Sequence, residues 1–475
     1  MRVPDYIVSY PRVRQHLDAL VRADRDTLAT DRYVRNYYGG GGPLLWVSRH
    51  GACDGADTLL AYLHKVDSMG FSQRKFGVRQ IEDNLRRLRR LDFDTIHTAS
   101  RVVARLDYLL TKYYLRYATG QRFGYFNPRH FLNRLDLVDT AQASRGYRTL
   151  YDVGIDVPGR LFFTQALSKV GHDSVGIFLH EIQPADTLDH RLGAMLCHGR
   201  FTADERTRIL VNMERRRWRT RRTPGLYGKY VVVNVPSFTL TAVDAGTVLS
   251  MRVGLGAVST KTPLLDSDIS RMDINPQWIV PKSIIRHSIA RHAGDSAYFA
   301  RNHYFVRERS TGRTVACHNA TADMLLSSQY AVVQKGGEGN SLGRIIFRFP
   351  NSFSVYLHDT PSRSFFSRPN RAVSHGCIRV ERPYDLAAFL LSGDDDADLD
   401  KIHYSMTAHV GASASAQTAD TLRRRMMIGS KKVTPVVPLF VTYYTLYPNH
   451  DGVMQSYPDV YGYDAVIAHY LDNFR

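Results

Sequence analysis

Ser374-His375-Gly376-Cys377-Ile378-Arg379 is the stretch that carries the chemistry and decides the fold of this chain of 475 residues. Upstream of it, Phe353-Ser354-Val355-Tyr356-Leu357-His358 alternates apolar and polar residues, as a β-strand with one buried face does. The apolar residues belong to a core, which leaves His358 on the polar side at the end of the strand. Fifteen residues then separate His358 from Ser374. The pattern predicts a strand that presents a histidine, followed by a loop and a cysteine.

These residues have the properties that acyl transfer by a cysteine requires. A thiolate is the working nucleophile, whereas a free cysteine at neutral pH is mostly thiol. His358 is the candidate base, while His375 and Arg379 lie close to Cys377 in the sequence. Gly376 permits a tight turn, so that the N–H groups of Gly376 and Cys377 can face a developing oxyanion. A lone cysteine in a strand is usually a small buried apolar residue, but the combination of strand phase, glycine and spacing favours catalysis.

The charge balance first suggests a polyanionic partner. The chain has 63 Lys and Arg against 45 Asp and Glu, a net charge of +18. Yet the arginines are spread through amphipathic helices, as in residues 84–90, and no zinc-finger, basic-leucine or RNA-binding signature is present. We therefore expect no nucleic-acid partner. An anionic cell wall or membrane surface accounts for the charge equally well.

Cysteine and histidine spacing indicates neither a disulfide framework nor a metal site. The four cysteines lie far apart, and none forms a C-x-x-C pair. No H-E-x-x-H is present, so we expect no metal and no cofactor. Residues 1–14 contain no apolar core of a signal peptide, which indicates either a cytoplasmic protein or a chain that begins after a removed leader. No apolar stretch reaches the roughly 18 residues that a transmembrane helix needs.

The length favours two or three domains, and the residue patterns change once along the chain. Residues 5–218 are mainly helical in pattern, and a composition change at 220–228 leads into β-branched runs. The prediction is an α+β protein, with a helical domain at 1–218 and a β-rich domain at 229–475. We expect strands at 231–235, 248–258, 344–349, 353–358 and 436–444, and helices at 283–301 and from Pro383 onward.

His358, the fifteen-residue spacing and Ser374 to Arg379 together resemble the signature of the L,D-transpeptidases, the YkuD-domain enzymes. The resemblance extends to several other segments of the β-rich half: 234–236, 251–254, 261–263, 275–281, 339–344 and 356–361. Segments 43–47 and 212–218 resemble the helical scaffold domain of the large Gram-negative periplasmic members. The implied fold is a helical scaffold followed by a YkuD-like catalytic domain, with a mobile capping subdomain inserted at 282–334. Lys282, Arg286 and Arg291 would give that subdomain a basic face, although a solvated helix face explains them as well.

The family resemblance implies a reaction on peptidoglycan stem peptides. Cys377 would attack the diaminopimelate carbonyl of a donor tetrapeptide, release D-alanine and pass the acyl group to the amine of an acceptor stem. His358 would be the base, and His375 would position the loop or bond to the thiol. Arg379, Tyr356, Trp278 and Ser374 are the candidate substrate-binding residues, although a structural salt bridge for Arg379 and packing roles for Tyr356 and Trp278 remain open.

The same resemblance implies acylation by carbapenems, no metal or other cofactor and a periplasmic location. The sequence leaves the oligomeric state open, and a monomer is favoured. Two alternatives remain. A carboxypeptidase or endopeptidase would use water in place of the acceptor amine, and a non-enzymatic basic protein would bind wall glycan or nucleic acid. A papain-like hydrolase is disfavoured because His358 precedes Cys377. Residues 162–217 contain no convincing peptidoglycan-binding module, so the positive charge is the candidate means of attachment to the wall.

Overall fold

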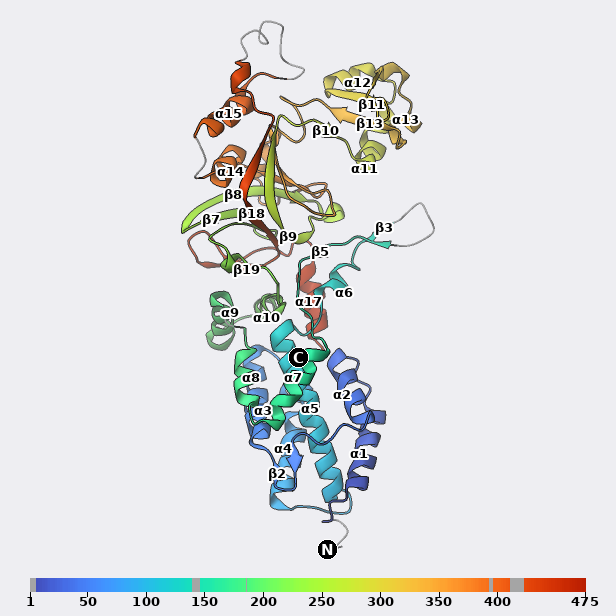
Figure 1. The fold of residues 1–475 in the computed structure, drawn as a ribbon, viewed down its shortest axis with the longest axis vertical. Coiled ribbons are helices and arrows are strands. Elements are labelled where there is room, and N and C mark those ends of the chain that lie inside the picture. The colour runs from blue at the N-terminus through green and yellow to red at the C-terminus, as the bar shows by residue number, and fades with distance from the viewer. Residues whose placement is uncertain (1–5, 139–145, 185, 393–395, 411–422) are drawn as a thin grey trace.

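The computed structural model describes residues 6–138, 146–184, 186–392, 396–410 and 423–475. The molecule is elongated, with a helical bundle at one end, a β-rich body beyond it and a small α/β unit beside that body (Figure 1). The predicted α+β class, helical first and β-rich second, is confirmed. No helix within the described ranges combines the length and the apolar character needed to cross a bilayer.

The helical half packs around one long helix, α5, which is buried along most of its 25 residues. Asp107 on α5 is fully buried, and its carboxylate accepts the N–H groups of Trp46 at 2.8 Å and of Val47 at 3.0 Å. A buried carboxylate needs such donors, so this contact fixes the loop before α3 against the bundle. The helices are α1 (Tyr10–Ala23), α2 (Ala29–Gly39), α3 (Asp54–His64), α4 (Val78–Arg90), α5 (Ala99–Phe123), α6 (Pro128–Leu132), α7 (Arg160–Gly171), α8 (Val175–Glu181), α9 (Thr187–His198) and α10 (Ala203–Arg217).

The β-rich half is built on one sheet in the order β14-β15-β17-β8-β7-β6-β18-β9-β5, and a further pairing of β9 with β14 closes it on itself. Alternate residues such as Val231, Val233 and Leu439 point into its core. The strands are β5 (Tyr151–Asp152), β6 (Lys229–Asn234), β7 (Thr239–Asp244), β8 (Thr247–Gly256), β9 (Leu264–Ile274), β14 (Ile345–Arg348), β15 (Leu357–His358), β16 (Ala372–Ser374), β17 (Ile378–Val380) and β18 (Ser430–Thr442). Helix α14 (Pro383–Leu390) begins at the proline, as predicted.

Residues 278–334, which we call the inserted module, form a separate four-stranded antiparallel sheet in the order β10-β13-β11-β12. The module has its own apolar core, centred on Phe299, Ile285 and Val332. Its elements are β10 (Trp278–Ile279), α11 (Lys282–Ile284), α12 (Ser296–Arg301), β11 (Tyr304–Glu308), β12 (Thr314–Val315), α13 (Ala322–Leu326) and β13 (Tyr330–Gln334). The expected continuous helix at 283–301 is wrong: a π-turn at Ile285–Ile289 and the left-handed Gly294 (φ +81°) interrupt it.

Two further differences from the expected organisation concern strands and domain boundaries. The expected strand at 353–358 is reduced to β15, because Ser354 has a φ of +56° and turns the backbone before the strand begins. Two contacts join the segments on either side of the predicted domain boundaries at residues 218 and 229. Strand β5, from the first half, pairs with β9, and helix α17 (Tyr463–Leu471), from the second half, packs on α10. Arg215 on α10 forms an ion pair of 2.7 Å with Asp464 on α17.

Candidate active site

The cysteine lies on a short loop between β16 and β17, and the loop is held by its own hydrogen bonds. The Ser374 hydroxyl donates to the Cys377 carbonyl at 2.6 Å and accepts the Gly376 N–H at 3.1 Å. Gly376 has a φ of +117°, a conformation that residues with a Cβ rarely adopt. The Thr262 hydroxyl donates to the Gly376 carbonyl at 2.9 Å. The loop is therefore fixed before any substrate arrives.

Parallel pairing of β15 with β17 brings the histidine strand beside the cysteine loop. In this register Leu357 lies opposite Ile378 and His358 lies opposite Arg379. The N–H of Ile378 donates to the Tyr356 carbonyl at 3.0 Å, so the pairing of the two strands extends to the residue that follows Cys377. His358 is thus within two residues of the position opposite Cys377. This pairing brings the strand that carries His358 next to the loop that carries Cys377.

The imidazole of His358 is buried and neutral. Its side chain is 3% exposed, and Nδ1 lies 2.5 Å from the carbonyl oxygen of Asp359. Burial, and next the positive charge of Arg379, lower the pKa of His358 to about 4, while hydrogen bonds to the Asp359 and Leu342 backbone act in the opposite direction. The contact with the Asp359 carbonyl favours the tautomer with a proton on Nδ1.

The thiol of Cys377 is half-buried, and its environment contains opposing influences. Sγ lies 3.8 Å from the Ser354 carbonyl oxygen. Burial raises the pKa of the thiol, whereas a hydrogen bond from the Tyr356 backbone N–H and the charge of Arg379 lower it. A thiol in this position depends on neighbouring groups to become a thiolate.

The side chains of Arg379 and Tyr356 both lie close enough to Cys377 to interact electrostatically with its thiolate form. The Arg379 guanidinium packs over the Phe365 ring at 5.5 Å, and its buried Nε has no hydrogen-bond partner within the described residues. Burial, and next the negative charge of a Cys377 thiolate, raise the pKa of Tyr356. The Arg348 guanidinium lies 5.7 Å from the Tyr356 ring centre. These groups place one cation and one aromatic ring near the sulfur.

The other candidate residues have different positions. His375 is exposed on the loop and makes no hydrogen bond to the thiol in the described structure. Trp278 packs against the core of the inserted module. The Ser374 side chain is used within the loop, as is the Gly376 N–H, so the expected pair of oxyanion donors is reduced to the N–H of Cys377.

Three supporting residues were not singled out from the sequence. The Thr262 hydroxyl donates a hydrogen bond to the Gly376 carbonyl, and the Asp359 carbonyl lies within hydrogen-bonding distance of the His358 imidazole. The Asn351 side chain accepts the N–H groups of Phe353 at 3.0 Å and Val355 at 3.1 Å, which shapes the turn that presents the Ser354 carbonyl to the sulfur. The signal for Asn351 was the asparagine itself, because its side chain commonly bonds to the backbone two residues on in turns. Among the described residues, no three His, Cys, Asp or Glu side chains gather as a metal site would require.

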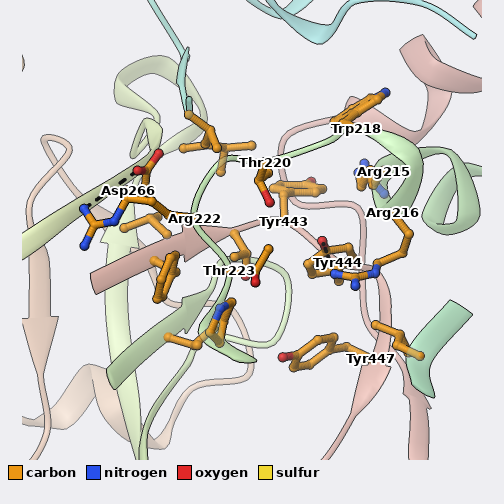
Figure 2. A pocket seen from close by; sticks show the side chains of 18 of the residues that line it. Arg215, Arg216, Trp218, Thr220, Arg222, Thr223, Asp266, Tyr443, Tyr444 and Tyr447 are labelled. Carbon is orange, nitrogen blue, oxygen red and sulfur yellow. Dashed lines mark hydrogen bonds and ion pairs between the residues drawn. The ribbon is translucent and has the colours of Figure 1, made fainter. Parts of the chain in front are cut away.

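A cavity of about 400 Å³ lies elsewhere, where the helical bundle meets the sheet (Figure 2). It is lined by aromatic residues such as Trp218, Tyr443 and Tyr444 and shares no residue with the candidate site. Its arginines are paired with carboxylates: Arg215 with Asp464, Arg216 with Asp186 and Asp189, and Arg222 with Asp266 and Asp268. The cavity therefore offers no free cation to an acidic substrate and is a feature of the domain junction.

Comparison with solved structures matches L,D-transpeptidases at low identity and low TM-score. One from Mycobacterium smegmatis is 14% identical, with 45% of this chain and 58% of that chain covered and a TM-score of 0.21. L,D-transpeptidase 1 of Mycobacterium tuberculosis is 15% identical, with 45% and 61% covered and a TM-score of 0.19. Superpositions at these scores carry no weight in the assignment.

Sequence relationships are more informative. A curated protein of Haemophilus influenzae, described as a candidate L,D-transpeptidase, is 30% identical over 245 residues, which make up 50% of this chain and 45% of that protein. The chain thus spans less than half the length of this curated relative. The model of the L,D-transpeptidase catalytic domain, YkuD, matches residues 228–403, and the model of the Scaffold domain matches residues 31–186. Residues 228–403, whose sheet carries Cys377 and His358, therefore form a YkuD L,D-transpeptidase catalytic domain, which follows a Scaffold domain at residues 31–186.

Proposed function

We propose that this protein joins peptidoglycan stem peptides through a thioester on Cys377. The observation that carries the proposal is the pairing of β15 with β17, which sets the neutral His358 beside the rigid Cys377 loop. The substrate class follows from the family, whose members act on stem peptides that end in D-alanine. Such a reaction takes place in the periplasm, where stem peptides are cross-linked.

In the first half-reaction, Cys377 Sγ attacks the diaminopimelate carbonyl carbon of a donor tetrapeptide. His358 Nε2 takes the thiol proton, the C–S bond forms, and the negative charge moves to the carbonyl oxygen. When the C–N bond breaks, the same proton passes to the nitrogen of the departing D-alanine. The N–H of Cys377 is the available oxyanion donor on the loop.

In the second half-reaction, the side-chain amine of an acceptor stem attacks the thioester carbonyl. A new C–N bond forms, the C–S bond breaks, and the amine proton returns through His358 to the sulfur. The energy of the original amide is retained in the thioester, so no nucleotide is consumed. Water in place of the amine would give the carboxypeptidase outcome, with the same first half-reaction.

Arg379 is the proposed contact for a carboxylate of the donor stem. Its buried Nε has no hydrogen-bond partner in the described structure, and the guanidinium lies near enough to the sulfur to lower the thiol pKa. Guanidinium groups bind carboxylates in a two-pronged geometry, which would orient the donor as well as attract it. Tyr356 would form an adjacent wall of the same site.

The proposal is tested by incubation of the purified chain with a carbapenem, followed by intact-mass measurement and peptide mapping. One adduct of the mass of the drug is expected, on Cys377. The Cys377→Ala variant should remain unmodified, and Cys197→Ala, which removes an exposed cysteine, should be modified like the wild type. An unmodified wild-type protein, or an adduct on another cysteine, would rule out the assignment.

Purified disaccharide tetrapeptides then identify the product. Release of D-alanine together with a dimer joined between diaminopimelate residues is the expected outcome. Release of D-alanine with only a disaccharide tripeptide would show that water is the acceptor. Absence of D-alanine release, despite a carbapenem adduct, would show that another acyl donor is used.

A further inference from the structure

The Asp359 carbonyl lies within hydrogen-bonding distance of the His358 imidazole. The N–H and the carboxylate of Asp359 bond to neighbouring segments. Its N–H donates to the Ile345 carbonyl at 2.9 Å. Its carboxylate accepts the N–H of Arg344 at 2.8 Å and Nη1 of Arg363 at 3.1 Å. Asp359 is only 5% exposed, so these bonds are shielded from water. The position of the imidazole therefore depends on the segment that contains Arg344.

That segment, residues 340–344, contacts both Asp359 and the imidazole. Gly343 has a φ of +65°, and a Cβ at this position would lie 2.5 Å from the Asp359 carboxyl group. The backbone of Leu342 hydrogen-bonds to the imidazole of His358. The close approach of turn and carboxylate is possible only because residue 343 has no side chain.

The same turn is tied to both chain connections of the inserted module by Asn340, which is fully buried. Asn340 Nδ2 donates to the carbonyl of Pro276, which precedes β10, at 3.2 Å and to that of Lys335, which follows β13, at 2.7 Å. Asn340 Oδ1 accepts the N–H of Leu342 at 2.8 Å. One side chain thus joins the chain entering the module, the chain leaving it and the turn beside the imidazole.

We propose that Asn340 and Asp359 are positioning residues that couple the placement of the inserted module to the orientation of the His358 imidazole. The inference rests on the proposed function, in which His358 is the base for Cys377. A rigid-body shift of the module moves Pro276 and Lys335, displaces Asn340 and reaches Asp359 through residues 342–344. Binding of a donor against the module would in this way adjust the base that activates the thiol.

The charges around the reacting pair determine how this coupling is detected. Arg379 on β17 faces both the imidazole and the thiol, and the Asp359 carboxylate is paired with Arg363. On β14 the residue opposite His358 is the apolar Ile346. Tyr356, with the Arg348 guanidinium over its ring, and the exposed His375 are further titratable groups of the described site. Loss of the coupling withdraws the correctly placed imidazole while Arg379 stays beside the thiol.

The experiment compares full-length Asn340→Asp and Asp359→Asn with the wild type. Alkylation of Cys377 by iodoacetamide is followed against pH, and acylation by a carbapenem is followed at fixed pH. Without the placed base, the alkylation midpoint should rise by about one pH unit and acylation should slow by about tenfold or more. Because both residues act through one chain of contacts, the double variant should be little worse than the more affected single variant.

Asp385→Asn is the matched control, since Asp385 forms an exposed ion pair with Arg382 and should leave the midpoint and the rate unchanged. Arg363→Gln removes one partner of Asp359 from a side chain that is 54% exposed, so it should fold and shift the midpoint less, in the same direction. If Asn340→Asp and Asp359→Asn do not fold, the alkylation midpoint of Arg363→Gln tests the coupling in their place. Wild-type midpoints in every folded variant would overturn the coupling. A wild type that carbapenems do not acylate would instead refute the proposed function, and the alkylation profile would still decide the coupling.

Discussion

The ammonium group of Lys261 lies 2.5 Å from a carboxylate oxygen of Asp136, and this ion pair joins the two halves of the molecule beside the Cys377 loop. Lys261 follows Thr260, whose hydroxyl donates to the Ser374 carbonyl at 2.9 Å. On the scaffold side, the Arg148 guanidinium donates to the Ser259 carbonyl at 2.9 Å. The helical half therefore supports the segment on which the cysteine loop rests.

Asp136→Asn is expected to destabilise the protein by about 1–3 kcal/mol, because it leaves the largely buried Lys261 without its counter-ion. Urea denaturation measures the change, and Asp385→Asn, in an exposed pair, should cost less than about 0.5 kcal/mol. Lys261→Met in the Asp136→Asn background should recover part of the loss. Equal stability of wild type and Asp136→Asn would show that the pair has no structural role.

His358→Gln should reduce the rate of acylation of Cys377 by about 10²- to 10⁴-fold, since general-base catalysis contributes about that much. Stopped-flow measurement with a chromogenic β-lactam gives the rate. His375→Gln, which changes the exposed histidine of the same loop, should have a much smaller effect. The reverse order of effects would make His375 the base.

Arg379→Met should raise the pH midpoint of Cys377 alkylation by about one unit, because an adjacent cation stabilises the thiolate and lowers the pKa of the thiol. Iodoacetamide labelling against pH gives the midpoint. Arg368→Met, at an exposed position between β15 and β16, is the matched control. No shift in Arg379→Met would show that the guanidinium does not act on the sulfur.

Gly376→Ala should destabilise the protein by about 1–3 kcal/mol and slow acylation. The nearest atoms to an added Cβ are 3.8 Å away, so the cost comes from the φ of +117° rather than from collision. Thermal melts and acylation rates measure both effects. Gly429→Ala, where an added Cβ meets nothing within 4 Å, is the comparison.

Glu214 and His358 should make opposite contributions to the pH dependence of stability. Burial raises the pKa of Glu214 to about 7, so its folded state holds a proton that the unfolded state releases, and stability falls between about pH 4.5 and 7. The pKa of His358 is lowered to about 4, so the unfolded state holds the extra proton and stability rises between about pH 4 and 6.5. In the wild type, the fall in stability with rising pH caused by Glu214 and the rise in stability caused by His358 largely cancel.

Each variant of this pair should therefore reveal the other slope. Glu214→Gln is expected to lose stability as the pH falls toward 4, and His358→Gln is expected to lose stability as the pH rises toward 7. Each change amounts to at most about 3 kcal/mol. Denaturant titrations at several pH values, monitored by the fluorescence of Trp218, which bonds to Glu214 at 3.2 Å, provide the measurement. Identical pH profiles in both variants would show that neither group titrates as described.

Local patterns predicted much of this molecule, and non-local contacts account for what they missed. The start of α14 is confirmed because its signal is a single proline, whereas the catalytic roles of Cys377 and His358, predicted from two short segments, remain predictions. The turn at Ser354 interrupts an alternation that would suit a strand, since side-chain pattern alone does not report φ. The roles of Asn340 and Asp359 depend on partners from three segments, which no periodicity reveals.

Strand β18 lies between β6 and β9, pairing with the first in parallel and with the second in antiparallel fashion. It is made after Cys377 and His358, and α17, which packs on the scaffold, is made later still. During translation Cys377, the proposed nucleophile, thus leaves the ribosome before the sheet around it can close. From the synthesis of Cys377 until β18 and α17 join the fold, the nascent chain carries an ordinary thiol, and the surroundings described for that thiol form only then.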